Sequence, residues 1–305
     1  MMPSTAVLIA NYKRSDLLAR TLESLRHCRL PERFCGVYVV ENGAKGTAQQ
    51  VCEAADRRLQ VQYLYHEEAN KSRALNYALT QMTSDLVIFF DDDVRLHADT
   101  LVAYERAAQQ HPRCYFGGPL EIDYERPPRD WLIPYLPHSA RGWHFEAQNA
   151  DDRPVFLGAN QAAFRAALRE VGGFDPTVGP GRGQGVGEDT RIQSSLSAAG
   201  YQPHYIPEAV VWHYVPVEAC SPTWALERAY RQALTFGESL QDDTPRLLGA
   251  PRWMLREWLE KRLRLWKLVL RRASEPERFA ARVDERRLRG WIDGFRRRPP
   301  AVTKV

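Results

Sequence analysis

The chain has 305 residues, of which 44% are hydrophobic and 26% are charged. This composition excludes a disordered protein, and 19 glycines are far too few for a collagen-like repeat. No apolar stretch approaches the roughly 20 residues that span a bilayer, and the first ten residues lack the pattern of a signal peptide. Five cysteines without a Cys-x-x-Cys pair argue against a disulfide framework or structural zinc. We therefore expect a cytoplasmic protein.

The net charge of +4 conceals an asymmetry along the chain. Residues 246–305 contain 18 Lys and Arg against 7 Asp and Glu, a net charge of +11. The first 245 residues contain 24 basic against 31 acidic residues, a net charge of −7. The acidic body and the basic C-terminal segment therefore need separate explanations.

The first 120 residues alternate between strand and helix patterns. The strand candidates are Ala6–Ala10, Gly36–Glu41, Val61–Tyr65, Leu86–Phe90 and Cys114–Leu120. The helical patterns between them cover Ser15–His27, Thr47–Arg58, Lys71–Met82 and Ala98–Gln110. This alternation predicts an α/β fold whose mostly parallel sheet carries helices on both faces. Ligands of such a sheet bind beyond the carboxyl ends of its strands.

After residue 120 the pattern is less regular. Glu121–Arg153 is rich in proline and aromatic residues and has no clear period. Regular structure is expected to resume in the order Val155–Asn160, a helix over Gln161–Val171, a glycine-rich loop Gly179–Gly187, a helix Glu188–Ala199, and short strands near Gln202–Ile206 and Ala209–His213. Beyond Pro222 the chain is predicted to be helical, with interruptions near Pro245–Pro251 and Ser274–Pro276.

Three adjacent acids, Asp91, Asp92 and Asp93, directly follow the apolar strand Leu86–Phe90. Adjacent carboxylates repel one another unless a cation neutralises them, and hard oxygen ligands suit Mg²⁺ or Mn²⁺ together with substrate phosphates. The alternative is a solvated acidic turn or an N-cap for the next helix. The position at the expected ligand-binding edge favours the metal site.

Other charged residues also stand at strand ends or helix starts. Glu188 and Asp189 open a helix, where they either complement its dipole or supply a general base beneath a mobile glycine loop. Lys71 and Arg73 begin a helix against its dipole, which favours a pyrophosphate ligand over a structural role. His213 follows a strand and is either structural or a metal ligand.

Several motifs occur in an order that resembles family 2 glycosyltransferases of the GT-A fold, over residues 5–215. They are V-L-I-A-N-Y-K-R (7–14), Y-V-V-E-N-G (38–43), N-K-S-R-A-L-N (70–76), D-D-D (91–93), G-A-N (158–160), G-G-F-D (172–175), G-E-D (187–189) and W-H (212–213). Each motif is weak alone, but their shared order is specific.

The resemblance implies a Rossmann-like GT-A domain and a role for each matching residue. Asp93, with Asp91 or Asp92, would hold Mg²⁺ or Mn²⁺ between the donor phosphates, with His213 as a third, distal ligand or a diphosphate contact. Asp189, supported by Glu188, would deprotonate an acceptor hydroxyl that attacks the anomeric carbon with inversion. The donor would be contacted by Asn11, Tyr12, Arg14, Glu41, Asn42, Lys71, Arg73, Asn76, Asp91 and Asp92. The acceptor side would include Gly158, Ala159 and Asn160.

Two departures from the family pattern concern the donor. Glu41 stands where the family usually has Asp, so uracil is the preferred base without being fixed. Asn11 stands where Thr is common before the tyrosine, and its amide can still bind the nucleoside. The Q-x-x-R-W element and the membrane-spanning helices of the processive members are not found in the sequence, so we expect one sugar to be transferred per encounter.

The segment Glu121–Arg153 contains Trp131 and Trp143 among its aromatic residues. Aromatic faces suit sugar rings, and the family builds its acceptor site in this region. The alternative is ordinary packing of amphipathic rings, and the sequence leaves both open.

Pro251–Arg272 is predicted to form a basic amphipathic helix. Its apolar half comprises Met254, Leu255, Trp258, Leu259, Leu263, Leu265, Trp266, Val269 and Leu270. Such a helix either lies in a membrane interface or docks on the catalytic domain with its bases solvated. We expect association of residues 251–298 with the inner face of the cytoplasmic membrane. Nucleic acid is not an expected partner, because the acidic body would repel it.

We therefore predict a catalytic domain over residues 1–220 and a basic helical extension over 221–305. The first domain divides into a nucleotide-sugar half, 1–120, and an acceptor half, 121–220. The predicted function is transfer of one sugar from a nucleotide-diphosphate sugar, UDP-linked by preference, to a glycan or lipid-linked glycan in polysaccharide or lipopolysaccharide synthesis. The alternatives are a non-catalytic sugar-nucleotide-binding or membrane-recruiting protein, or a sugar-phosphate nucleotidyltransferase.

Overall fold

The computed structural model describes residues 2–148, 152–180 and 187–297, and its contacts divide the chain into two compact units. The first unit runs to Asp123 and resumes over His138–Tyr214. The second combines Tyr124–Pro137 with the chain from Val215 onward. The sequence placed its boundary at residue 220; by contacts, the C-terminal unit also takes in part of the proline-rich segment.

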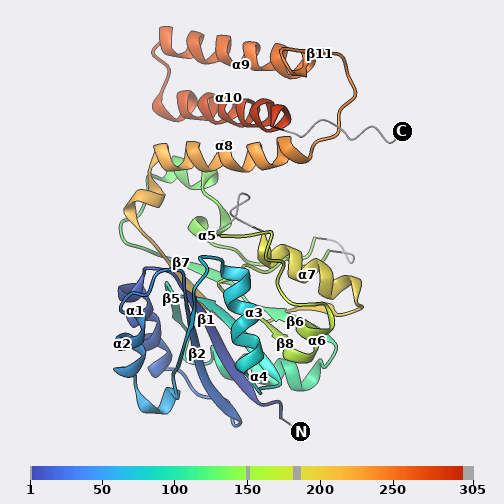
Figure 1. Cartoon of the computed structure of the whole chain (residues 1–305). Helices are drawn as coiled ribbons and strands as arrows, with labels where there is room; N and C mark the ends of the chain where they lie inside the picture. The colour runs from blue at the N-terminus through green and yellow to red at the C-terminus, as the bar shows by residue number, and fades with distance from the viewer. Residues whose placement is uncertain (1, 149–151, 181–186, 298–305) are drawn as a thin grey trace, which may run out of the picture. The chain divides into compact units, whose positions relative to one another are not determined.

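The first unit is built on a seven-stranded sheet in the order β3-β2-β1-β4-β8-β6-β9 (Figure 1). Its strands are β1 (Thr5–Asn11), β2 (Phe34–Asn42), β3 (Gln62–His66), β4 (Leu86–Asp91), β6 (Cys114–Gly117), β8 (Gln161–Phe164) and β9 (Gln202–Tyr205). All neighbouring strands are parallel except β8, which runs antiparallel to both β4 and β6. The mostly parallel α/β sheet predicted from the sequence is confirmed.

Helices cover both faces of this sheet. They are α1 (Ser15–Arg26), α2 (Ala48–Glu53), α3 (Lys71–Gln81), α4 (Thr100–Gln110), α6 (Arg165–Glu170) and α7 (Glu188–Ala198), with a short α5 (His138–Arg141) and the 3₁₀ turn η1 (Arg57–Leu59). A second sheet has the order β5-β10-β7, formed by β5 (Val94–Leu96), β10 (Val211–Val215) and β7 (Leu120–Tyr124).

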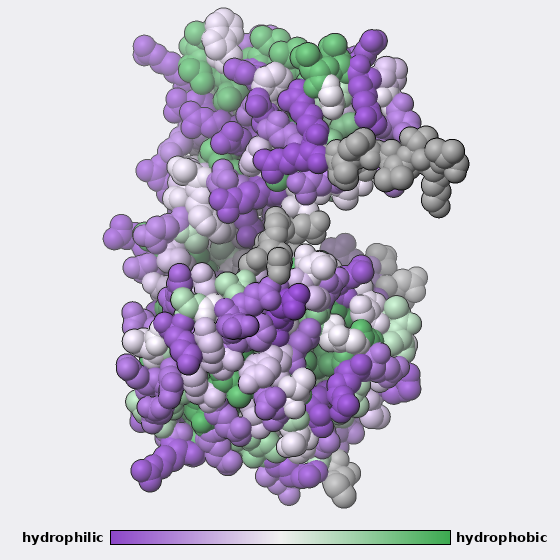
Figure 2. Space-filling model, viewed as in Figure 1, coloured by the Kyte–Doolittle hydropathy of each residue, from purple (hydrophilic) through white to green (hydrophobic). Residues whose placement is uncertain are grey.

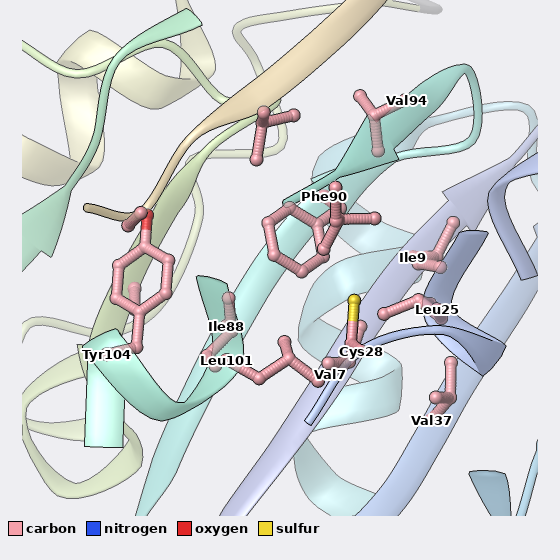
Figure 3. Packing of buried hydrophobic residues seen from close by; sticks show 14 of the residues in the cluster. Val7, Ile9, Leu25, Cys28, Val37, Ile88, Phe90, Val94, Leu101 and Tyr104 are labelled. Carbon is pink, nitrogen blue, oxygen red and sulfur yellow. The ribbon is translucent and has the colours of Figure 1, made fainter. Parts of the chain in front are cut away.

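Alternate residues of β1 belong to two hydrophobic clusters. Val7 and Ile9 pack with residues of α1, α2 and α4, whereas Ala6 and Leu8 pack with residues of α3, α6 and α7. Figure 3 shows the first cluster, in which residues from neighbouring strands point toward Leu25 and Cys28. Because both faces of the sheet are buried, its strands are continuous apolar runs in the sequence. Each fully buried aliphatic side chain contributes about 1.5–3 kcal/mol to the stability of the fold.

Two predicted elements were wrong. Gln161–Phe164 is a strand, and the helix expected over Gln161–Val171 begins only at Arg165, while residues 152–157 have no regular structure. The alanines of this segment favour a helix, but pairing between β4 and β6 overrides that propensity. The strand expected over Cys114–Leu120 is interrupted at Gly118, where a Cβ would lie 2.2 Å from the carbonyl oxygen of Ala209.

The second unit consists mainly of three long helices, α8 (Pro222–Ser239), α9 (Arg252–Leu270) and α10 (Glu275–Arg296). Shorter elements are η2 (Asp130–Tyr135), η3 (Val217–Cys220) and the strands β11 (Arg246–Leu247) and β12 (Ala250–Pro251). Gly290 and Gly294 let α10 approach α8 closely, because a Cβ at these positions would meet backbone oxygens at 2.6 and 2.1 Å. Among the described residues, no helix is long and apolar enough to cross a membrane.

Candidate active site

Three neighbouring parallel strands end at one edge of the main sheet and bring polar residues together. Asn11 ends β1, Asn42 ends β2 and Asp91 ends β4, in a register that pairs Asn11 with Glu41 and Ala10 with Asp91. A cavity of about 400 Å³ opens at this edge. Its lining residues are Ala10, Tyr12, Arg14, Asn42, Ala69, Lys71, Asp91 and Pro180. The sheet thus places a pocket where the strand order predicted one.

Asp91, Asp93 and His213 could hold a metal ion. One ligand atom from each of them lies within 4.8 Å of the others. His213 comes from β10, which pairs with β5 so that His213 faces Val94, next to Asp93. Asp93 Oδ1 lies 3.3 Å from His213 Nε2, but it is buried and makes no hydrogen bond with any described residue. Two carboxylates, one imidazole and an unsatisfied buried oxygen fit Mn²⁺ or Mg²⁺.

Asp92 is oriented differently from the two acids beside it. Its side chain is fully buried, accepts a hydrogen bond of 2.7 Å from Asn11 Nδ2 and pairs with Arg14. Arg14 also contacts Asp93 at 2.6 Å. Burial, together with the charges of Asp93 and Asp91, raises the pKa of Asp92 to about 7. Asp92 therefore fixes the acidic turn through its contacts with Asn11 and Arg14.

Lys71 links the metal-ligand cluster to the acids of α7. Its ammonium group lies 2.8 Å from Asp91 Oδ1 and 3.3 Å from Glu188 Oε1. Burial opposes ionisation of Lys71, but the charges of Asp91, Asp189 and Glu188 outweigh it and hold its pKa well above the usual value. Lys71 in turn lowers the pKa of Asp91 despite the burial of that carboxyl group. This lysine therefore keeps the two acidic groups close together.

Asp189, in the first turn of α7, is held from two sides. Gly158 approaches so closely that a Cβ there would lie 2.2 Å from Asp189 Oδ2, and the Gly158 backbone N–H donates to the carboxylate. Gln161 Nε2 donates to Asp189 Oδ1 at 3.2 Å. Burial and repulsion by Glu188 and Asp91 raise the pKa of Asp189 to about 7, against the opposing charge of Lys71. A fixed carboxylate with a pKa near neutrality is suited to general base chemistry.

Gln161 and Gln193 are site residues that the sequence analysis missed. Gln193 Nε2 donates to Gln161 Oε1 at 2.9 Å and thereby orients the Gln161 amide toward Asp189. Gln193 is itself fixed by the backbone of Phe156 through two hydrogen bonds of 2.9 Å. Gln161 was assigned to a helix. As the first residue of antiparallel β8 it instead stands opposite Phe89, near the carboxyl end of β4.

Three residues expected at the donor have protein partners in this structure. Glu41 is fully buried and accepts hydrogen bonds from Tyr63 Oη at 2.7 Å and from the Gly46 backbone at 2.8 Å. The Asn76 amide donates to Phe174 O and accepts from Phe174 N, both at 2.8 Å. The Arg73 guanidinium is exposed and lies 3.1 Å from Glu68. These three side chains therefore have partners within the protein, and their contact with a donor stays a prediction.

The residues expected at the acceptor also make internal contacts. Asn160 is fully buried, donates to Pro119 O and Ala209 O, and accepts from Tyr104 Oη at 2.7 Å. Ala159 belongs to the hydrophobic core. Trp143 packs edge-on against Phe156 and Tyr205.

Two further predictions concern Trp131 and the glycine-rich loop. Trp131 belongs to the second unit, where its ring lies 5.1 Å from that of Phe279. Of the glycine-rich loop Gly179–Gly187, residues 181–186 lie outside the described residues.

Comparison with known proteins identifies a matching family and a curated relative. The sequence model described as "Glycosyltransferase like family 2" matches residues 3–235. A curated relative, the succinoglycan biosynthesis protein ExoM of Rhizobium meliloti (strain 1021), is 26% identical over 247 residues, covering 77% of this chain and 74% of its own.

Solved glycosyltransferases share the fold. The mannosyltransferase PcManGT from Pyrobaculum calidifontis, in complex with GDP-Man and Mn²⁺, has a TM-score of 0.56 and 22% identity. That match covers 81% of this chain and 66% of the mannosyltransferase. GalNAc-T7 with UDP, GalNAc and Mn²⁺ has a TM-score of 0.56 and 12% identity, covering 79% of this chain and 52% of its own. S. aureus TarS 1–349 with UDP-GlcNAc has a TM-score of 0.52 and 16% identity, covering 76% and 66%. With this GT-A architecture and the match over most of its length, the chain belongs to glycosyltransferase family 2 and is a transferase.

Proposed function

We propose that this transferase moves one sugar, with inversion, from a nucleotide-diphosphate sugar to a hydroxyl group of a glycan or lipid-linked glycan. The observation that carries the proposal is the position of Lys71, which contacts both Asp91 of the Asp91–Asp93–His213 cluster and Glu188, the neighbour of Asp189 in the chain. Lys71 thus joins carboxylates that can hold a metal to the pair that contains the proposed base, and both Lys71 and Asp91 line the cavity.

Asp91, Asp93 and His213 would hold Mn²⁺ or Mg²⁺. When bound, the ion supplies positive charge to the two donor phosphates and to the leaving nucleoside diphosphate. Lys71, which lines the cavity, adds a fixed ammonium group, and Arg14 adds a guanidinium group at its rim. Tyr12 and Asn42, which line the cavity, are proposed to position the nucleoside. Asn11 is fully buried, and its amide is proposed to hold Asp92 and thereby the acidic turn.

Asp189 is the proposed general base. It would take the proton from the acceptor hydroxyl as that oxygen forms a bond to the anomeric carbon. The bond between the anomeric carbon and the diphosphate oxygen breaks, and the electron pair leaves with the nucleoside diphosphate. Because attack and departure are on opposite faces of the sugar, the configuration inverts. Glu188 raises the basicity of Asp189 by like-charge repulsion.

The donor is proposed to be UDP-linked, and the product a polysaccharide or other glycoconjugate precursor. Support for the pathway comes from the ExoM relative, a succinoglycan biosynthesis protein. The choice of uracil as the base rests on the family resemblance at Glu41 alone, because this side chain is fully buried and its carboxylate is held by Tyr63 and Gly46. A different nucleotide sugar, such as a GDP-linked one, is therefore the main rival among donors.

A panel of UDP-, GDP- and dTDP-sugars tests the proposal. Nucleoside diphosphate release is measured with Mn²⁺, with Mg²⁺ and with excess chelator. We expect one nucleotide class to be consumed, and only with a divalent cation, because the chelator removes the charge that stabilises the leaving group. Donor binding by calorimetry without hydrolysis or transfer would instead support a non-catalytic sugar-nucleotide-binding protein.

A further inference from the structure

Helix α9 carries apolar side chains on two opposite faces. One face, which includes Met254 and Trp258, packs against α10 and the residues around it. The other face presents Leu259, Leu263, Trp266 and Leu270, which recur at intervals of four, three and four residues and therefore line one side of the helix. We call these four residues the α9 stripe. Trp266 is 61% exposed and Leu270 is 63% exposed.

The single apolar face predicted for residues 251–272 was wrong, because α9 has one packed apolar face and, separately, the exposed α9 stripe. That prediction joined Met254 and Leu259 in one half of the helix and omitted Leu268, which is buried. The fold buries part of the apolar surface and leaves the rest in solvent. Figure 2 shows apolar side chains over α9 surrounded by hydrophilic ones. One side of the helix therefore docks within the protein, and the other side is exposed.

Basic residues border the α9 stripe. Residues 252–272 contain eight Lys and Arg against two Glu, a net charge of +6. At 100° per residue, Arg256 and Lys267 lie along one edge of the stripe and Arg262 along the other. All three are exposed and therefore available to solvent or to a ligand.

A groove of about 710 Å³ adjoins the stripe within the helical unit. Trp258, Trp266 and Val269 are among its lining residues, and the guanidinium carbons of Arg262 and Arg289 lie 4.9 and 5.6 Å from the centre of the Trp258 ring. The acids at this groove are engaged, because Glu285 accepts from Trp258 Nε1 and Asp293 pairs with Arg289. Because Arg289 is used in that pair, Arg262 and Arg286 are the guanidinium groups that the groove offers to an anion next to an apolar surface.

We propose that the α9 stripe docks on an anionic lipid surface. Leucine and tryptophan side chains would enter the interfacial layer, while Arg256, Arg262 and Lys267 contact lipid phosphates at its edges. A second copy of this chain is a poorer occupant, because two α9 helices, each of net charge +4, would face each other. This inference does not rest on the proposed reaction, since vesicle binding requires neither donor nor metal.

Co-sedimentation of the full-length protein with vesicles tests this proposal. We expect binding to vesicles that contain phosphatidylglycerol, weak binding to pure phosphatidylcholine, and release by salt. Trp266→Asp should lower the vesicle affinity at least about 10-fold, because an ionised group replaces an aromatic one in the interface. Reversing Arg256 and Lys267 together to Glu should lower it at least about 25-fold, given roughly 1 kcal/mol per base.

Leu248→Asp is the matched control, because Leu248 is also exposed in the second unit but lies outside the stripe. It should bind vesicles as the unmodified chain does, and circular dichroism should confirm that both variants are folded. Equal affinities of Trp266→Asp and Leu248→Asp would overturn the proposal. So would a dimer in solution that Trp266→Asp dissociates without any vesicle binding by the unmodified chain. Asp189→Asn should bind vesicles fully, which separates this test from that of catalysis.

Discussion

At the residue scale, the proposed chemistry depends on the protonation of Asp189. Its pKa is raised to about 7, so the carboxylate is the minor form at low pH. We expect kcat/KM, measured at saturating metal, to fall about tenfold per pH unit on the acid side of an apparent pKa at or below 7. A cation on the neighbouring ligands would lower that value, because positive charge favours the carboxylate.

Glu188→Gln provides the internal check on this pH profile. Glu188 raises the pKa of Asp189 by repulsion, so its neutralisation should move the acid limb to lower pH. An acid limb that stays at the same pH in Glu188→Gln would assign it to another group.

Gln161 is expected to act through Asp189 as a positioning residue. Gln161→Leu removes the hydrogen bond to Asp189 Oδ1 and leaves the side-chain size similar. We expect kcat to fall about 10-fold while the KM for the donor is unchanged, because a misplaced base affects the chemical step more than donor binding. Stopped assays over a range of donor concentrations separate the two constants. Thr80→Ala, at an exposed position of α3, is the control for ordinary surface changes. A rise in donor KM at constant kcat would contradict the positioning role.

At the element scale, the end of β4 brings like charges together before any cation binds. Asp92 and Asp189 have a pKa near 7 in the folded chain but an ordinary value of about 4 when unfolded. Between about pH 4 and pH 7 the folded state therefore binds more protons than the unfolded state. The stability of the metal-free protein should fall as the pH rises through this range. Saturating Mn²⁺ should raise Tm more at pH 8 than at pH 6, which differential scanning fluorimetry can measure. Asp93→Asn should abolish the difference, and an equal Tm shift at both pH values would count against the metal site.

The start of β8 is tied to two other segments by Asn160. Its amide donates to the carbonyl groups of Pro119 and Ala209 and accepts from Tyr104 Oη. Asn160→Ala therefore leaves the Ala209 oxygen without this donor and the buried Tyr104 hydroxyl group without this acceptor, while Pro119 O keeps a bond of 3.4 Å from Val211 N. We expect a loss of about 1–3 kcal/mol in the free energy of unfolding for each group, seen in urea titrations. A variant with unchanged stability and a raised acceptor KM would instead support the acceptor-binding role that the family resemblance implied.

The parallel strands could be predicted from sequence because their side chains are buried on both faces and separated by helical patterns. Their ends then located Asn11, Asn42 and Asp91 at one edge. The antiparallel strand β8 could not be predicted from sequence, because its two alanines favour a helix locally. Only their pairing with β4 and β6 makes them part of a strand. With β8 misassigned, the contact between Gln161 and Asp189 could not be seen. The partners of Glu41 and Asn76 were likewise fixed by long-range contacts.

At the scale of the whole molecule, the small net charge is the sum of two opposed regions. Residues before 246 carry the acids of the candidate metal site and base, and the later residues carry the basic borders of the α9 stripe. If the stripe brings the enzyme to lipid-linked acceptors, Trp266→Asp should reduce transfer to a vesicle-borne acceptor at least about 10-fold. Transfer to a water-soluble acceptor should be unchanged. A parallel loss with both acceptors would show that the substitution damages the enzyme itself.

The central claim is that Asp189 removes the acceptor proton in a metal-dependent sugar transfer. The most direct measurement is single-turnover transfer, followed by mass spectrometry, with the unmodified chain, Asp189→Asn and the exposed control Glu208→Gln. Asp189→Asn keeps the shape of the side chain, so the donor should still bind while the transfer rate falls by about 10²–10⁴. Glu208→Gln should transfer at the full rate. A fully active Asp189→Asn would contradict the account.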